Sequence, residues 1–187
     1  MKIGVLSLQG DFEAHTRVLA RLDMPYCEIR HPEQLRDTDG LILPGGESTT
    51  MVKFIQAAGF EPALKAYAKA RRPIFGTCAG AILLAAEVID RPQFSLGLID
   101  LVVRRNAYGR QVDSFIEVGP CAGFNEPLEM VFIRAPIIES VGPSVSVLAR
   151  AQNRPVLVRS GNILVSTFHP ELTVDNRVHA YFLAMAH

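Results

Sequence analysis

The chain has 187 residues, enough for one domain with a buried core, so we expect a single domain over residues 1–187. Hydrophobic residues make up 49% of the chain, and 19 basic residues balance 19 acidic ones. Because no large field of one sign results, we expect neither a nucleic acid nor an anionic membrane as partner, and a small uncharged or zwitterionic ligand fits better.

The first half of the chain alternates short apolar strands with amphipathic helices. Residues 2–8 read as a buried strand, and the charged Asp11 and Glu13 follow before a signal-peptide core or membrane span is complete, so we expect a cytoplasmic protein. Further strands are predicted at 26–30, 40–46 and 72–76, and helices at 11–23, 48–59, 61–70 and 79–89. This alternation predicts an α/β fold whose mainly parallel central sheet carries helices on both faces.

The second half consists of strands separated by turns. They are predicted at 96–106, 113–119, 130–134, 144–150, 154–160 and 162–168. The RSGN stretch at 159–162 is typical of a hairpin, so antiparallel strands are expected in this half. An amphipathic helix at 173–186 ends the chain.

The segment GTCAG places Cys78 between a predicted strand and a predicted helix, with glycines two residues away on either side. This is the pattern of a nucleophile elbow with sulfur in place of a hydroxyl, and the helix N-terminus favours the thiolate. The amide of Ala79 would then be one oxyanion donor. The alternative is that Cys78 is a small buried hydrophobic residue. Cys27 and Cys121 lie in no such turn, and the three cysteines have no C-x-x-C spacing, so neither a disulfide framework nor a metal site is predicted.

A cysteine nucleophile needs a base, and position favours His169 among the five histidines. It follows a predicted strand and opens the HPE segment, so Glu171 can reach back to its second ring nitrogen. His15 and His179 fall inside helical patterns, where a histidine is more often packed or solvated. The sequence therefore predicts Cys78, His169 and Glu171 as nucleophile, base and orienting acid.

A glycine pair follows the predicted strand in LILPGGESTT. Glycines allow close approach of the backbone, so the amide of Gly46 is the candidate second oxyanion donor. A plain tight turn would use the same residues.

In the order PGG, GTCAG, HPE, these segments resemble the class I glutamine amidotransferases with their Cys-His-Glu triad. Nearly the whole chain resembles one family among them, the glutaminase subunits of pyridoxal 5'-phosphate synthase. The segments that carry the resemblance are GVLSLQG, LILPGGESTTM, FGTCAG, RRNAYGRQVDSF, VFIRAP and FHPELT.

The resemblance implies hydrolysis of L-glutamine to L-glutamate and ammonia. It also implies that the ammonia passes to a separate synthase subunit in a hetero-oligomer, which makes pyridoxal 5'-phosphate in vitamin B6 biosynthesis. Pyridoxal 5'-phosphate would then be the product of the complex, and no cofactor of this chain is expected. Two rivals are a peptidase-like or stress-response relative with the same elbow cysteine, and a catalytically silent binding subunit. HPE and the glutamate and arginine residues expected in the glutamine pocket disfavour the first rival, and the presence of Cys78, His169 and Glu171 disfavours the second.

Glutamine is a zwitterion, so a selective pocket should offer a carboxylate to its ammonium group and arginine to its carboxylate. The resemblance carries substrate-binding roles to Gly46, Glu47, Ser48, Arg105, Ile133 and Arg134. Alternatives remain for two of them: Glu47 could serve a helix N-terminus, and Arg105 could be surface charge beside Arg104.

Gln9 and Gly10 follow the first predicted strand and should lie at the same end of the sheet as Cys78 and Gly46. We expect a partner pressing on this loop to reorganise the Gly46 amide. The alternative is a simple strand-to-helix turn, with Asp11 favourable near the helix N-terminus.

Overall fold

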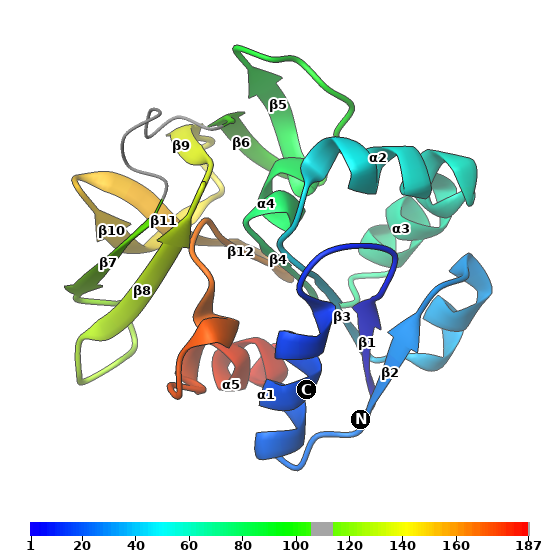
Figure 1. Ribbon diagram of the computed structural model, residues 1–187, viewed down its shortest axis with the longest axis horizontal. Helices are drawn as coiled ribbons and strands as arrows, with labels where there is room; N and C mark the ends of the chain where they lie inside the picture. The colour runs from blue at the N-terminus through cyan, green and yellow to red at the C-terminus, as the bar shows by residue number, and fades with distance from the viewer. Residues whose placement is uncertain (106–113, 187) are drawn as a thin grey trace.

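The computed structural model describes residues 1–105 and 114–186 (Figure 1). Its α-helices are α1 (Phe12–Arg21), α2 (Ser48–Ala57), α3 (Phe60–Lys69), α4 (Ala79–Leu84) and α5 (Arg177–Ala184). The strands of the large sheet are β1 (Ile3–Leu6), β2 (Tyr26–Ile29), β3 (Gly40–Leu43), β4 (Ile74–Thr77), β10 (Ser146–Ala151), β11 (Arg154–Ser160) and β12 (Ile163–Ser166). The smaller sheets contain β5 (Ala85–Ile89), β6 (Ile99–Arg104), β7 (Ser114–Gly119), β8 (Leu128–Ile133) and β9 (Ile137–Val141), and two 3₁₀ helices are η1 (Pro32–Asp37) and η2 (Pro170–Leu172).

The central sheet has seven strands in the order β10-β11-β12-β4-β3-β1-β2. The five strands from β12 to β2 run parallel, while β10 and β11 add antiparallel strands at one edge. The predicted α/β fold with a mainly parallel sheet and antiparallel strands from the second half is confirmed. The RSGN hairpin is also confirmed, since Ser160 of β11 pairs with Ile163 of β12 across a two-residue loop.

Alternate residues of the parallel strands face opposite sides of the sheet, as the period of two requires. In β3, Leu41 and Leu43 join the hydrophobic cluster under α2, α3 and α4, whereas Ile42 joins the cluster under α1 and α5. Figure 1 shows the same division, with α1 and α5 on one side of the sheet and the other helices opposite. Burial on both faces explains why these strands read as continuous apolar runs.

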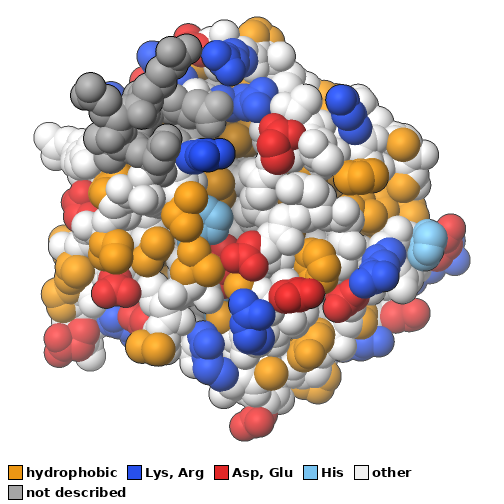
Figure 2. Space-filling view, viewed as in Figure 1, with side chains coloured by type: hydrophobic (Ala, Val, Ile, Leu, Met, Phe, Trp, Pro, Cys, Tyr) orange, Lys and Arg blue, Asp and Glu red, His pale blue; other side chains and the backbone are white. Residues whose placement is uncertain are grey.

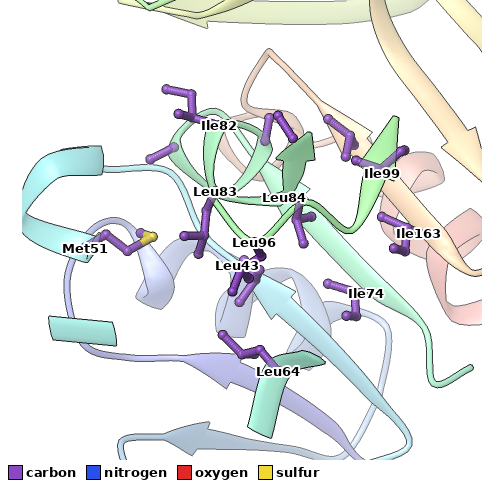
Figure 3. Packing of buried hydrophobic residues seen from close by; sticks show 14 of the residues in the cluster. Leu43, Met51, Leu64, Ile74, Ile82, Leu83, Leu84, Leu96, Ile99 and Ile163 are labelled. Atoms are coloured by element: carbon purple, nitrogen blue, oxygen red, sulfur yellow. The ribbon is translucent and has the colours of Figure 1, made fainter. Parts of the chain in front are cut away.

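The short helix α4 is fully buried between the sheet and the α2 side of the molecule. Figure 3 shows its Ile82, Leu83 and Leu84 side chains in the same cluster as Leu43 of β3 and Met51 of α2. This packing fixes the position of the residue that precedes α4, which is Cys78.

The predicted helix over 79–89 is wrong in its second half. Helix α4 ends at Leu84, and Ala85–Ile89 forms β5, which pairs in parallel with β6. The alanines favour a helix locally, but a strand here satisfies backbone groups along β6 and buries Ala85 and Val88. Strand β9 was not expected from the sequence and pairs antiparallel with β6.

Parts of two predicted strands lie outside the described residues, namely residue 106 of the segment 96–106 and residue 113 of the segment 113–119. Residues 106–113 of the RRNAYGRQVDSF motif lie outside them as well. Within residues 1–105 and 114–186, none of the helices combines the length and the apolar character needed to cross a bilayer.

Candidate active site

The candidate residues gather at the carboxyl ends of three neighbouring parallel strands. Gly45 and Gly46 follow β3, Cys78 directly follows β4, and His169 comes three residues after β12. Because β3, β4 and β12 are adjacent and parallel, these residues meet at one edge of the sheet. α/β folds commonly bind ligands at this edge.

The Cys78 backbone has the unusual conformation expected of a nucleophile elbow. Its φ is 47° and its ψ is −100°, a left-handed region that L-residues rarely occupy. Two backbone hydrogen bonds hold the turn: Cys78 N donates to Ser166 O at 2.9 Å, and Ile82 N donates to Cys78 O at 3.2 Å. Cys78 is 7% exposed, and its sulfur lies 3.9 Å from the Ile133 carbonyl oxygen. The turn therefore presents the thiol at the cavity beyond the sheet edge.

His169 and Glu171 form a short, buried pair. His169 Nδ1 lies 2.7 Å from Glu171 Oε1, and the Glu171 side chain is fully buried. The backbone holds the histidine in place, because His169 N donates to Val131 O of β8 at 2.8 Å. His169 Nδ1–H donating to the carboxylate leaves Nε2 free to exchange a proton with a nucleophile.

The protonation of the pair follows from these contacts. Burial alone lowers the pKa of His169, but its interactions with Cys78 and Glu171 outweigh burial and raise the pKa to about 10. Burial alone raises the pKa of Glu171, but the rings of His15 and His169 outweigh it and lower the pKa to about 2. The site is thus built to hold an imidazolium between a carboxylate and a sulfur.

Gly45 is a site residue that the sequence analysis did not single out. A Cβ placed on it would lie 2.5 Å from His169 Cε1 and 3.3 Å from Cys78 Cβ. Only a glycine leaves room here for both side chains. The PGG segment was a signal for this role, because glycines allow close approach of the backbone, but the prediction named a site role for Gly46 alone.

The predicted oxyanion donors lie on two segments that flank Cys78. Ala79 is the first residue of α4, so its amide has no acceptor one turn earlier in the helix. Gly46 has a φ of 150°, and a Cβ on it would lie 2.6 Å from Gln9 Oε1. The oxyanion roles of both amides stay predictions.

The Gln9–Gly10 loop contacts the glycine turn directly. Glu47 N donates to Gln9 Oε1 at 3.2 Å, and Asp11 N donates to Gly45 O at 3.1 Å. A Cβ on Gly10 would collide with Gly45 O. A movement of this loop would therefore change its contacts with the turn that holds Gly46.

A cavity of about 420 Å³ opens over Cys78 and His169. Its lining includes all six predicted substrate-binding residues, namely Gly46, Glu47, Ser48, Arg105, Ile133 and Arg134. Asp11, Gly45, Ile82 and Leu172 complete the lining. The volume lies in the range of small-molecule sites, and the lining carries both signs of charge.

Two polar residues of the lining also have structural contacts. The Glu47 carboxylate caps α2 by accepting from Thr49 N at 3.1 Å and Thr50 N at 2.7 Å, so the alternative role at a helix N-terminus is present as well. Burial alone raises the pKa of Glu47, but the hydrogen bonds from Thr50 and Thr49 outweigh it and lower the pKa to about 2. Arg105 is turned inward, with its side chain 14% exposed and Nη2 3.6 Å from Glu47 Oε1.

His15 is a second residue whose contact with the triad was not predicted from the sequence. It was expected to be packed or solvated, and it is fully buried, with Nε2 3.5 Å from Glu171 Oε1 and 3.1 Å from Thr77 Oγ1. A histidine on the apolar face of an amphipathic helix was the available signal, but nothing in the local pattern names its partners.

The three cysteines are free thiols in the structure. Cys121 is buried, and burial raises its pKa to about 11, which disfavours a thiolate there. Cys27 lies in β2, an edge strand, away from the cavity lining.

Comparisons with known proteins agree with this geometry. The model of the SNO glutamine amidotransferase family matches residues 5–187. The "Pyridoxal 5'-phosphate synthase subunit PdxT" of Koribacter versatilis is 55% identical over 99% of this chain and 95% of its own length, and that of Thermosipho africanus is 51% identical over 99% and 98%. A crystal structure described as a glutamine amidotransferase is 47% identical, covers 98% of both chains and superposes with a TM-score of 0.94.

Proposed function

Because the chain belongs to the SNO glutamine amidotransferase family, we propose that it hydrolyses L-glutamine to L-glutamate and ammonia with Cys78, His169 and Glu171. We propose further that it is the glutaminase subunit of a pyridoxal 5'-phosphate synthase, in line with the names of its relatives. The observation that carries the catalytic proposal is the strained Cys78 turn at one cavity with the buried His169–Glu171 pair. A cytoplasmic location stays a prediction.

In the first half of the reaction, the Cys78 thiolate attacks the carboxamide carbon of glutamine. The carbonyl oxygen becomes negatively charged, and the amides of Gly46 and Ala79 donate to it. His169, charged in the resting pair, gives its Nε2 proton to the leaving nitrogen, so ammonia departs and a thioester to Cys78 remains.

In the second half, His169 is neutral and takes a proton from a water molecule. The hydroxide adds to the thioester carbon, and collapse of this adduct releases glutamate and regenerates the Cys78 thiolate. Glu171 stabilises the imidazolium in both halves by accepting from Nδ1 at 2.7 Å, and it need not carry a proton itself.

The charges around the cavity suit the α-carboxylate and α-ammonium groups of a free amino acid. Arg105 and Arg134 can bind the α-carboxylate of glutamine through guanidinium forks, and Glu47 can accept from the α-ammonium group. Ser48 Oγ lies 3.1 Å from Gln93 Oε1, so this hydroxyl is already oriented at the cavity wall. The main chain at Ile133 would border the substrate next to the sulfur.

We propose that the synthase subunit docks over the mouth of this cavity. Ile133 and Leu172 line the cavity and are exposed, and Ile116, Val118 and Val174 are exposed as well. Figure 2 shows hydrophobic side chains gathering over β7 and β8 on this face. Asp11 lines the same cavity, so a partner seated there would reach the Gln9–Gly10 loop.

The Cys78→Ser variant tests the catalytic proposal. It should keep the fold and glutamine binding but lose turnover by roughly 10⁴- to 10⁶-fold, the loss seen when one member of such a unit is removed. Ammonia release is measured with glutamine and, against the peptidase-like alternative, with peptide substrates. Cys27→Ser and Cys121→Ser are the matched controls and should stay fully active. Wild-type ammonia release from Cys78→Ser would disprove the assignment.

Partner control is tested with the wild type and Gln9→Ala, each with and without the synthase subunit. The wild type alone should release little ammonia, and the synthase subunit should raise the rate, because docking would complete the oxyanion hole through the loop. Equal rates in all four samples would refute activation by the partner. Activation that persists in Gln9→Ala would reject only the route through Gln9.

A further inference from the structure

Behind the candidate triad lies a second, fully buried pair of histidines. His15 of α1 and His179 of α5 are both inaccessible to solvent, and His15 Nδ1 lies 2.9 Å from His179 Nε2. Their rings meet Phe75 of β4 edge-on, with centroids at 6.3 and 5.6 Å. Figure 1 shows α1 and α5 side by side under the sheet, close to the segment that carries Glu171.

This pair reaches the triad through the Glu171 carboxylate. Oε1 of Glu171 lies 2.7 Å from His169 Nδ1 and 3.5 Å from His15 Nε2. The other oxygen, Oε2, has no hydrogen-bond partner among the described residues. A buried carboxylate needs N–H groups or positive charge beside it, and here the two rings at Oε1 and a hydrogen bond from the Glu171 backbone supply them.

The ring protons can be placed by elimination. If His179 Nε2–H donates to His15 Nδ1, then His15 Nε2–H points to Thr77 Oγ1 and the Glu171 carboxylate. In the opposite arrangement a lone pair of His15 would face the carboxylate. A buried N–H at His179 Nδ1 would then have no acceptor, since that atom has no hydrogen-bond partner within the described residues. The first arrangement leaves only one lone pair without a partner, at His179 Nδ1. The second leaves a buried N–H without an acceptor and also turns a ring lone pair toward the carboxylate, so the first arrangement is favoured.

We infer that His15 is a positioning residue for Glu171, oriented in turn by His179. The inference rests on the proposed function, because it gives His15 a role only through the Glu171–His169 pair. At 3.5 Å the His15 contact is longer than a hydrogen bond, so it acts as a dipole that favours the ionised carboxylate and keeps Oε1 aimed at His169. His15 is not one of the residues that line the cavity.

The surroundings support a neutral His15. Burial lowers the pKa of His15 more than Glu171 and Asp11 raise it, and the nearby His169 lowers it further. Burial likewise lowers the pKa of His179 to about 3, with His15 and Arg21 acting in the same direction and Glu171 opposing. A neutral ring with a fixed N–H can orient the carboxylate without competing with His169 for the proton.

The test compares His15→Gln with His15→Asn, a matched pair of amides. The glutamine nitrogen can take the place of Nε2 beside Glu171, whereas the shorter asparagine amide reaches only the position of Nδ1, where its oxygen can accept from His179 Nε2–H. With the synthase subunit present, we expect His15→Asn to lower kcat about tenfold with an unchanged KM for glutamine, and His15→Gln to retain most of kcat. Val18→Ala, a buried change on the same helix, is the control for packing and should leave kcat unchanged.

A readout independent of glutamine hydrolysis is the pH dependence of Cys78 alkylation by iodoacetamide. If Glu171 is held less firmly as an anion, the imidazolium of His169 is less stable, and the Cys78 thiolate forms only at higher pH. The midpoint of alkylation should therefore move to higher pH in His15→Asn and stay near the wild-type value in His15→Gln.

Double variants with Glu171→Gln decide whether His15 acts through Glu171. Adding His15→Asn to Glu171→Gln should produce little further loss of kcat, whereas independent effects would multiply. Wild-type kcat and alkylation in His15→Asn, or a full tenfold loss added to Glu171→Gln, would overturn the inference. Lack of ammonia release by the wild-type complex would instead overturn the proposed function.

Discussion

Replacing Gly45 with alanine tests whether the tight contact between the glycine turn and His169 matters for turnover. The backbone of Gly45 lies outside the left-handed region, so alanine meets no conformational penalty there. Its Cβ, however, would lie 2.5 Å from His169 Cε1, well inside the 3.4–4 Å of ordinary contacts. The ring must therefore shift by roughly 1 Å, and a displacement of this size can cost about 100-fold in rate.

We expect Gly45→Ala to lower kcat by about two orders of magnitude with little change in KM for glutamine. Ammonia release is measured with the synthase subunit present, and circular dichroism with thermal melting checks the fold. Gly119→Ala is the matched control, because a Cβ there would lie 3.3 Å from the flexible end of Met130 and 3.7 Å from Arg150 O. Full activity in a folded Gly45→Ala variant would refute the argument that this contact positions the base.

Three further predictions concern recognition, the base and acid stability. Arg105→Ala or Arg134→Ala should raise KM for glutamine about 10- to 100-fold while alkylation of Cys78 stays normal, and an unchanged KM in both variants would remove them from the pocket. His169→Asn should lose nearly as much turnover as loss of Cys78, whereas Glu171→Gln should retain more because it only orients and stabilises charge; a silent Glu171→Gln would contradict the triad. Because the pKa of Glu171 is about 2 against 4.5 ordinarily, its ionised form stabilises the fold above about pH 4.5 and this stabilisation is lost as the pH falls toward 2. The thermal midpoint of the wild type should therefore fall over that range, and a Glu171→Gln variant with the same slope would contradict the assignment.

Local patterns in the sequence were enough to predict the parallel sheet and the edge where the site lies. Each of β3, β4 and β12 is a short apolar run followed by Gly, Cys or His, and parallel strands bring such ends together. The hairpin at 159–162 was equally local, because the turn residues themselves favour it.

Features that depend on distant partners could not be read from the sequence. The segment Ala85–Ile89 has a helical composition at its start, and only pairing with β6 makes it a strand. His15 and His179 are 164 residues apart, and their contact requires α1 and α5 to pack side by side. The tight fit of Gly45 likewise depends on the His169 ring, which a different part of the chain supplies.

The backbone conformation of Cys78 lowers the stability of the fold at the residue that catalysis needs. With φ at 47° and ψ at −100°, the nucleophile occupies a conformation that costs an L-residue roughly 1–3 kcal/mol and costs glycine almost nothing. A glycine at this position would relieve that cost, and each kcal/mol regained raises the melting temperature of a protein of this size by about 2–4 °C. Screens of variants for survival at high temperature alone would thus favour loss of the nucleophile, so thermal improvement of this protein must be selected together with ammonia release.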